Sequence, residues 1–393
     1  MSKLTPVDPV ALAQALIRCP SVTPKESGTL AIIEEVVTRF GFTSHRLRFD
    51  QGEFIVDTLY ARLGSRQPHF CFAGHSDVVS PGDRTYWTVD PFEGQIVTDQ
   101  VFGRGAVDMK GGIASFLAGL SRFLHQAGSP SGSISLIITA DEEGPHNYGI
   151  VKVLEWLAHH DERLDACLVG EPTSQHTLGD TIKIGRRGSL NCFLRVHGIQ
   201  GHTAYPHLVD NPLPKLIRIL NHFTTESLDH GTAYFPPSLL SLTSIDTRNS
   251  ADNIIPATSE ARFNIRFNDL YTKESLLSWL RHHIEAVTQD YTLEVLGGAE
   301  AFLTLPGPFS DMVCKVIEEQ LGRKPHLSTS GGTSEARFIK DYCPVVELGL
   351  VSKTMHRCDE HVSIRDLDCL ADLYAAILHE YFRHHDTRSL NTA

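Results

Sequence analysis

Three short apolar runs, each ending at acidic or histidine side chains, constrain the fold of this chain more than any other feature. They are HFCFAGHSDVV (69–79), SISLIITADEE (133–143) and DACLVGEP (165–172). Apolar runs of this length, without polar alternation, are typical of strands that are buried on both faces. Amphipathic helical patterns at 111–128 and 149–160 separate them along the chain. Strands alternating with helices predict an α/β fold whose sheet is covered by helices on both faces.

The pattern changes at about residue 188. From there the segments follow the order β-α-β-β-α-β, which predicts a separate α+β module with an antiparallel sheet. After about residue 301, a helix, an apolar strand and a last helix resemble the first part again. The chain has 393 residues, more than one hydrophobic core usually holds. We therefore expect a mixed-sheet main domain made of residues 1–187 and 301–393, with residues 188–300 inserted as an α+β, ferredoxin-like domain.

Composition narrows the possible partners and the cellular compartment. A formal net charge of -12 argues against nucleic acid or an anionic membrane, because both attract basic surfaces. No apolar stretch approaches the roughly 20 residues that span a bilayer. The eight cysteines form no C-x-x-C pair, a pattern typical of free thiols in a reducing cytosol. We expect a cytoplasmic protein that acts on a small molecule, with no nucleic-acid or membrane partner.

Polar side chains suited to metal binding or proton transfer gather at the ends of the predicted strands and in one glycine-rich turn. They are His75, Asp77, Asp108, Glu142, Glu143 and Glu171. Each has a common structural explanation when taken alone. A histidine at a strand end is usually a satisfied structural residue, an aspartate before a helix is often an N-cap, and an acidic pair is often surface charge. Their coincidence at neighbouring strand ends favours a shared site, because ligands gather at the carboxyl ends of such strands.

So many carboxylates close together would repel one another and shift their pKa values unless cations balance them. Imidazole and carboxylate ligands without thiolate favour zinc, with cobalt or manganese as substitutes. One ion would be crowded by this set, whereas two ions about 3.5–4 Å apart could share a carboxylate. Neighbouring side chains of an extended chain point to opposite faces, so Glu142 and Glu143 must have different tasks.

Further motifs carry a resemblance to a known family. They are FGRGAVDMKGG (102–112), IGRRGSL (184–190), QGHTAYPHL (200–208), GGTSEARF (331–338) and MHRCDEHV (355–362). With the strand ends above, they make nearly the whole chain resemble the zinc-dependent aminoacylase and carboxypeptidase-like metallohydrolases. The resemblance implies two zinc ions per subunit, with cobalt as a possible substitute. The ligands that it implies are His75 and Glu171 for one ion, Glu143 and His356 for the other, and Asp108 bridging both.

The same resemblance implies hydrolysis of a succinyl amide in a small substrate with several carboxylates. Glu142 would be the general base, and Asp77 would orient His75. Residues 188–300 would form a homodimer, in which His202 reaches the active site of the other subunit and binds the developing oxyanion. Further substrate contacts implied by the motifs are Arg186, Arg187, Ser189, Tyr205, Asn253, Arg266, Gly332 and Thr333.

Some positions depart from the family pattern, and two other functions stay open. Glu335 and Ala336 stand where Asp and Gly are expected, Ser352 where Asn is expected near the substrate, and Asp252 where Asn is usual. These positions concern substrate contacts more than metals. A related deacylase, such as one acting on acetylornithine, is therefore the nearest alternative. A non-catalytic relative that only binds small molecules is the alternative from another class.

Two details of the site are also predicted. By resemblance, the peptide bond that follows Asp108 is expected to be cis. The segment MHRCDEHV offers two histidines for the last metal position, His356 and His361. We expect His356 to be the ligand, because it follows the strand PVVELGL (344–350) closely and matches the family position, and we expect His361 to be structural or solvent-facing.

Overall fold

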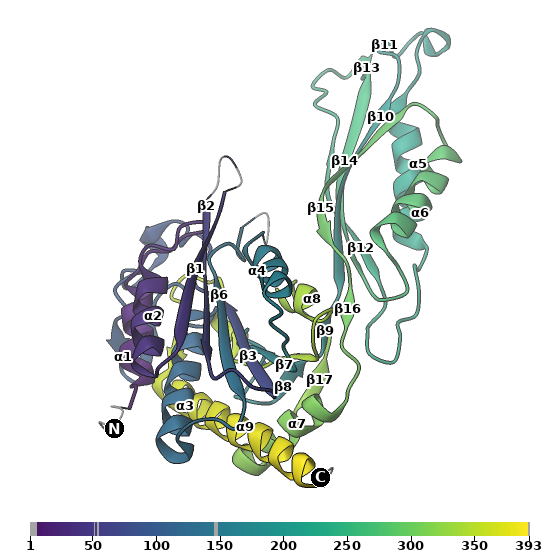
Figure 1. Cartoon of the computed structure of the whole chain (residues 1–393). Helices are drawn as coiled ribbons and strands as arrows, with labels where there is room; N and C mark the ends of the chain where they lie inside the picture. Colours follow the sequence, from purple (N-terminus) through teal and green to yellow (C-terminus); the bar gives the residue numbers. More distant parts are fainter. Residues whose placement is uncertain (1–5, 51, 53–54, 145–147, 392–393) are drawn as a thin grey trace. The chain divides into compact units, whose positions relative to one another are not determined.

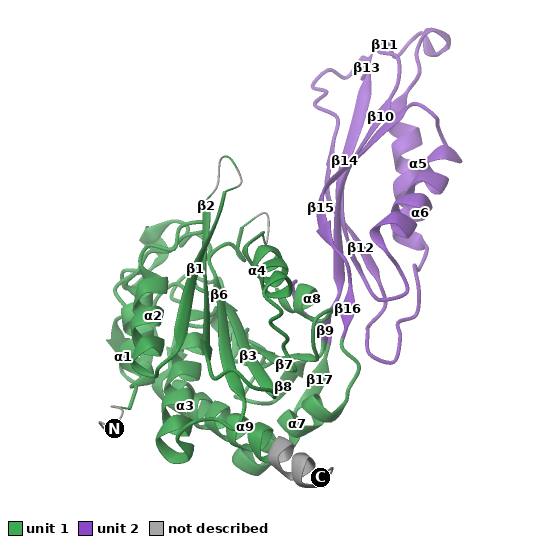
Figure 2. Cartoon of the chain, viewed as in Figure 1, with its two compact units in different colours: residues 1–184, 304–328, 334–393 green, residues 185–303, 329–333 purple. Residues whose placement is uncertain are grey.

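The structure is a computed structural model that describes residues 6–50, 52, 55–144 and 148–391. The chain divides into two compact units, shown in Figure 2: unit 1 comprises residues 1–184, 304–328 and 334–393, and unit 2 comprises residues 185–303 and 329–333. The two main breaks lie within three residues of the domain boundaries expected from the sequence. Within the described residues, none of the helices is both long and apolar enough to traverse a bilayer.

Unit 1 is built on an eight-stranded sheet (Figure 1). In spatial order its strands are β1 (Thr43–Asp50), β2 (Ile55–Leu63), β6 (Ser133–Thr139), β3 (His69–His75), β7 (Ala166–Val169), β18 (Val345–Glu347), β8 (Thr181–Lys183) and β17 (His326–Ser328). β3 pairs in parallel with both β6 and β7, whereas β2 pairs antiparallel with β1 and β6. The sheet is therefore mixed. The three apolar runs form its central strands, in which every residue is buried.

Helices cover both faces of this sheet. One face holds α1 (Pro9–Ile17), α2 (Thr29–Arg39), α3 (Lys110–Ala127), α7 (Pro308–Leu321) and α9 (Ile364–Asn391), and the other holds α4 (Tyr148–His159) and α8 (Ala336–Ile339). Neighbouring residues of β2 show the division, since side chains alternate along a strand. Leu59 belongs to the core under α1, α2 and α3, whereas Tyr60 contacts Trp156 of α4. The expected α/β class with a mixed, doubly covered sheet is confirmed.

β1 and β2 are the two longest strands of unit 1 that the sequence pattern did not indicate. β1 lies at the edge of the sheet and has the sequence TSHRLRFD. Its charged and exposed residues obscure the alternation of apolar and polar side chains that would indicate a strand. A smaller sheet of β4 (Ile96–Val97), β5 (Gln100–Phe102) and β19 (His361–Ser363) joins two distant parts of unit 1. It brings the segment that follows His356 beside the turn that leads to Asp108.

Unit 2 has the expected β-α-β-β-α-β order. Its antiparallel sheet contains, in spatial order, β12 (Leu239–Asp246), β14 (Thr258–Phe267), β10 (Gly188–His197) and β15 (Tyr291–Ala299). α5 (Pro212–Thr225) and α6 (Lys273–Glu285) pack on one face through a separate apolar core. Two small pairs lie at opposite ends of this unit, namely β9 (Gly185–Arg186) with β16 (Phe302–Leu303), and β11 (Gly201–His202) with β13 (Ile254–Ile255) (Figure 1). This strand order is that of a ferredoxin-like module.

Candidate metal centre

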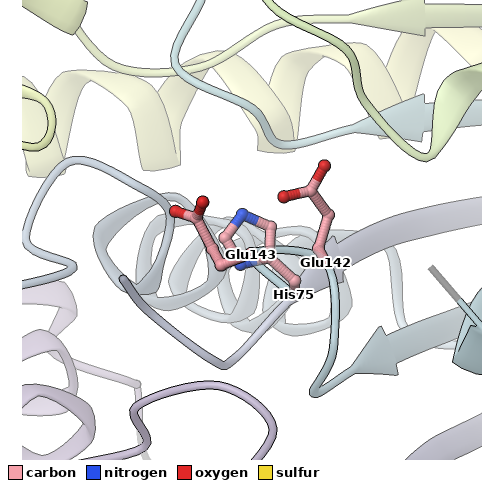
Figure 3. Close-up of side chains that lie close together, drawn as sticks. All are labelled: His75, Glu142 and Glu143. Carbon is pink, nitrogen blue, oxygen red and sulfur yellow. The ribbon is translucent and has the colours of Figure 1, made fainter. Parts of the chain in front are cut away.

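The ends of three neighbouring parallel strands bring the acidic and histidine side chains together. His75 is the last residue of β3, Glu142 and Glu143 follow β6, and Glu171 follows β7. Because β6, β3 and β7 are parallel, their carboxyl ends meet at one edge of the sheet. In the view of Figure 3, the carboxylates of Glu142 and Glu143 lie to either side of the imidazole ring of His75.

Asp108 joins two sets of possible metal ligands. Its Oδ1 lies 3.0 Å from His75 Nε2, and the same nitrogen lies 3.5 Å from Glu171 Oε1. Its Oδ2 lies 3.2 Å from His356 Nε2, which is also 2.9 Å from Glu143 Oε1. Each oxygen of the Asp108 carboxylate thus faces a different histidine. One set consists of His75, Asp108 and Glu171, and the other of Asp108, Glu143 and His356.

The electrostatics of the cluster suit cations. Burial alone would raise the pKa of Asp108, but hydrogen bonds with His356 and His75 outweigh it and hold that pKa below its usual range. Hydrogen bonds with Asp108 and Glu143 raise the pKa of His356 to about 10. Burial would lower the pKa of His75, yet its carboxylate neighbours, Asp108 first, hold it well above its usual value. Both imidazoles therefore lie where the carboxylates stabilise positive charge, and the oxygen and nitrogen donors fit two divalent ions.

The three consecutive acidic residues divide their tasks. Asp141 Oδ2 accepts hydrogen bonds from the N–H groups of Tyr148 and Gly149, at 2.6 and 2.9 Å, and so caps the start of α4. Glu143 contacts His356, whereas Glu142 belongs to a third group with His75 and Glu143 whose ligand atoms lie within 4.8 Å of one another. Burial raises the pKa of Glu142 well above its usual range. The capping role of Asp141 was missed in the sequence, although the helix pattern a few residues later was a signal for it.

Asp77 holds the turn that carries both glutamates. Its carboxylate accepts the N–H of Glu142 at 3.3 Å and that of Glu143 at 3.0 Å. The Nδ1 of His75 lies 3.0 Å from the Asp77 carbonyl oxygen and 3.6 Å from its carboxylate. If Nδ1 donates to that carbonyl, Nε2 remains free to face Asp108 and Glu171. The contact expected between Asp77 and His75 is therefore closer through the backbone than through the side chain.

The glycine-rich turn brings Asp108 against the strand ends. The peptide bond between Asp108 and Met109 is cis, so that prediction is confirmed. α3 begins at Lys110, and an added Cβ on Gly112 would lie 2.6 Å from the carbonyl oxygen of Gly170. A side chain at this position would push the start of α3 away from the residue that precedes Glu171. Glycine is required here by a close approach of two backbone segments.

His356 and His361 have different surroundings. The Nε2 of His356 lies between Asp108 and Glu143, whereas the ring of His361 packs against Phe102 with centroids 4.7 Å apart. The Nδ1 of His361 lies 2.7 Å from the Asp359 carbonyl oxygen. Among the described residues, the ligand groups of unit 1 contain His356 and not His361.

The expected substrate contacts all belong to unit 2, where they form two separate groups. Those near β9 and the start of β10 are Arg186, Arg187, Ser189, Arg266, Gly332 and Thr333. Ser189 is the strand partner of Arg266. Burial lowers the pKa of Arg266, and the positive charge of Arg187 lowers it further.

The other group lies around β11, beyond the far end of β10. The ring of Tyr205 is 5.6 Å from that of His202. Thr203 N–H donates to the carbonyl of Asn253. All three predicted residues of this group, His202, Tyr205 and Asn253, are exposed.

The positions that depart from the family pattern have mixed surroundings. Glu335 is 1% exposed, its Oε1 accepts a hydrogen bond from the Thr139 hydroxyl at 2.7 Å, and burial raises its pKa to about 8. Ala336 is buried at the start of α8. The Ser352 hydroxyl donates to the Ser174 carbonyl. Asp252 is exposed. Glu335 is thus a buried residue that supports β6, beside the start of the acidic turn.

Comparison with known proteins identifies the class of this chain. The model of peptidase family M20/M25/M40 matches residues 71–380, so the chain belongs to this family, and the membership expected from its motifs is confirmed. A protein of Rhodospirillum centenum named succinyl-diaminopimelate desuccinylase is 56% identical over 376 residues, which are 95% of this chain and 97% of that protein. A protein of the same name from Parvibaculum lavamentivorans is 50% identical, with 97% of each chain covered.

Solved structures agree on the fold. Aminopeptidase PepT from Bacillus cereus matches with a TM-score of 0.76 at 19% identity, over 95% of this chain and 98% of that one. The YXEP protein of Bacillus subtilis, described as a dinuclear metal-binding peptidase of the M20 family, matches with a TM-score of 0.68 at 15% identity, over 94% and 96% of the two chains. At these identities the likeness concerns the fold alone.

Proposed function

We propose that the chain is a dinuclear metallohydrolase that cleaves the succinyl amide of N-succinyl-L,L-2,6-diaminopimelate to succinate and L,L-diaminopimelate. This reaction belongs to the biosynthesis of lysine and of a cell-wall precursor. The observation that carries the proposal is the 56% identity, over nearly the full length of both chains, to a protein of that name. The two ligand sets joined by Asp108 support the same chemistry, because they fit a pair of divalent ions.

The proposed ligands are His75 and Glu171 for one ion, Glu143 and His356 for the other, and Asp108 for both. We propose zinc as the metal, with cobalt as a substitute, because imidazole and carboxylate donors suit both. When bound, the metals would polarise the amide carbonyl and lower the pKa of the attacking water. The free thiols of all eight cysteines agree with a reducing, cytoplasmic location.

Glu142 is the proposed general base. It would take a proton from the attacking water and return it to the leaving amine nitrogen, a role that needs a carboxylate with a raised pKa. Glu142→Gln should lower turnover by about 10²–10⁴-fold or more while both metals stay bound. Glu143→Gln is the matched control, because it should weaken the second metal in a titration. Substantial activity in Glu142→Gln would rule out this role.

The two histidines of the segment after β18 provide a second pair of variants. His356→Ala should reduce binding of one metal and remove most activity, because it deletes a ligand that faces both Asp108 and Glu143. His361→Ala should cost little of either, because that ring contacts Phe102. The opposite ranking would reassign the ligand.

We also propose a homodimer formed through residues 188–300, in which His202 serves the active site of the other subunit. The two groups of expected substrate contacts in unit 2 support this arrangement. From Ser189 to His197, β10 is extended, so at about 3.4 Å per residue these ends lie roughly 27 Å apart. A small substrate that touches both groups would therefore need them from two different protomers.

Mixing two inactive variants tests the shared site. His202→Ala and Glu142→Ala subunits should together recover part of the activity, since one site of the mixed dimer would keep both groups. Unchanged inactivity despite proven subunit exchange would exclude sharing.

The substrate is tested directly. Purified protein supplied with zinc should hydrolyse succinyl-diaminopimelate much faster than acetylornithine. Preference for acetylornithine would favour the related deacylase, to which the departures at Asp252 and Ser352 are relevant. A metal content near zero after purification with zinc, together with no hydrolysis of either compound, would instead favour a non-catalytic binding protein.

A further inference from the structure

A buried ion pair lies directly behind two of the proposed metal ligands. The Nη1 of Arg104 donates to Glu360 Oε2 at 2.6 Å, and the two residues are 2% and 0% exposed. The guanidinium also lies over the ring of Trp87, 5.2 Å from its centroid. A buried ion pair is weak evidence for stability, because desolvation offsets the attraction between the charges. The other contacts of each partner are therefore more informative than the pair itself.

Each partner holds the backbone of a different ligand. Glu360 Oε1 accepts the N–H of Asp108 at 3.1 Å and that of the preceding residue, Val107, at 2.9 Å. The Nη2 of Arg104 donates to the carbonyl oxygen of His356 at 3.3 Å. Asp108 and His356 are 248 positions apart in the chain, yet the same ion pair fixes the backbone of both. The Nε2 of His356 and the Oδ2 of Asp108 lie 3.2 Å apart.

The backbone of His356 explains why such a fixation matters. Its φ is +62°, in the left-handed region that residues other than glycine seldom adopt. A conformation of this kind persists where the surroundings hold it in place. The bond from Arg104 to the carbonyl of His356 is such a constraint, and it acts on the residue that presents Nε2 to Asp108 and Glu143.

We infer that Arg104 and Glu360 are positioning residues that set the affinity of the second metal site. They are not among the proposed metal ligands, and they act through the backbone of Asp108 and His356. Partners that orient metal ligands from behind typically change metal affinity by 10–100-fold when they are altered. This inference rests on the proposed dinuclear site. Asp108 belongs to both ligand sets, whereas His356, which Arg104 holds, belongs to the second set alone. The second site should therefore depend on the pair more than the first.

Arg104→Lys is the sharper variant. Lysine keeps the charge next to Glu360 but lacks the planar fork that reaches the carbonyl of His356 as well. Zinc titration against a chromophoric chelator should show the second ion bound 10–100-fold more weakly and the first ion within about threefold of wild type. Equal weakening of both ions would indicate a general structural effect and would overturn the inference, as would unchanged affinities.

A double variant separates positioning from stability. Arg104→Met combined with Glu360→Leu removes both charges, so no unpaired charge stays buried, a replacement that is often neutral for folding. Thermal unfolding of the metal-free protein should be close to that of wild type, whereas the second zinc should still bind 10–100-fold more weakly. Wild-type zinc affinities in a folded double variant would refute the inference. Failure of both variants to fold would give the pair a purely structural role and would also refute it.

The wild-type titration keeps the two proposals apart. Two bound zinc ions in wild type make the variants a test of Arg104 and Glu360 alone. Fewer than two ions in wild type would overturn the proposed dinuclear site itself, and with it the inference that rests on it.

Discussion

Acidification should destabilise unit 1 through one buried histidine outside the proposed metal ligands. His69 begins β3 and its side chain is 0% exposed. Its Nδ1 lies 2.9 Å from the Arg163 carbonyl oxygen and its Nε2 lies 2.8 Å from the Ser135 hydroxyl. Burial, reinforced by the positive charge of Arg62, lowers the pKa of His69 to about 4. The folded protein therefore favours the neutral ring.

The sign and size of the effect follow from this pKa. Between pH 6.5 and pH 4 the unfolded chain binds more protons at this histidine than the folded protein does, so stability falls as the pH falls. The stabilisation is fully present above pH 6.5 and is lost as the pH approaches 4. The difference between 6.5 and about 4 is worth about 3.4 kcal/mol. About 2 kcal/mol of it should be lost between about pH 7 and about pH 5.

A variant isolates this contribution from that of other titrating groups. His69→Gln removes the titration of this side chain. In denaturant unfolding, the difference in unfolding free energy between wild type and His69→Gln should therefore be about 2 kcal/mol smaller at about pH 5 than at about pH 7. Both proteins are measured with chelator present, which keeps metal release out of the comparison. His125→Gln, the same substitution at an exposed position of α3, is the matched control. A gap between wild type and His69→Gln that does not vary with pH would refute the reasoning.

Three further predictions concern packing, a buried hydrogen bond and the metals. Gly119→Ala places a Cβ 2.4 Å from the Ala371 carbonyl oxygen, where α3 crosses α9. It should lower the unfolding free energy by about 1–3 kcal/mol or more, and an unchanged midpoint of denaturant unfolding would contradict this. Tyr374→Phe removes a 2.6 Å bond to the buried Leu348 carbonyl and should cost about 1–3 kcal/mol, measured by urea denaturation. Zinc at about 100 times the Kd of a site should stabilise the metal-free protein by about 2.7 kcal/mol for each ion bound, measured by thermal unfolding. No shift on adding zinc would contradict specific binding.

The sequence predicted the central part of the fold because its signals are local. The runs that became β3, β6 and β7 are wholly apolar, and a buried strand needs no more than that to be recognised. β1 was not recognised, because an edge strand tolerates the exposed charges of TSHRLRFD. β8 and β17 have only three residues each, too few for a periodic pattern to emerge.

The candidate site was also predictable only in part. Strand ends indicate where polar side chains converge, so His75 and the glutamates could be grouped from their positions in the sequence. The contacts behind them could not be grouped in this way. Arg104 meets Glu360 only because β19 pairs with β5, a pairing of two three-residue strands without a sequence signal. The capping of α4 by Asp141 had only an indirect signal, the helix pattern a few residues later.

The carboxylate of Asp108 has one oxygen toward each ligand set, so the two proposed metal sites would be thermodynamically coupled. An ion held by the first set would fix the plane of that carboxylate and so orient its other oxygen in advance. The second ion would then meet a ligand whose rotational entropy is already lost. Because such coupling is reciprocal, the second ion would tighten the first by the same factor. Occupancy by zinc should therefore rise more steeply with concentration than two independent sites allow, and Asp108→Asn should abolish that steepness.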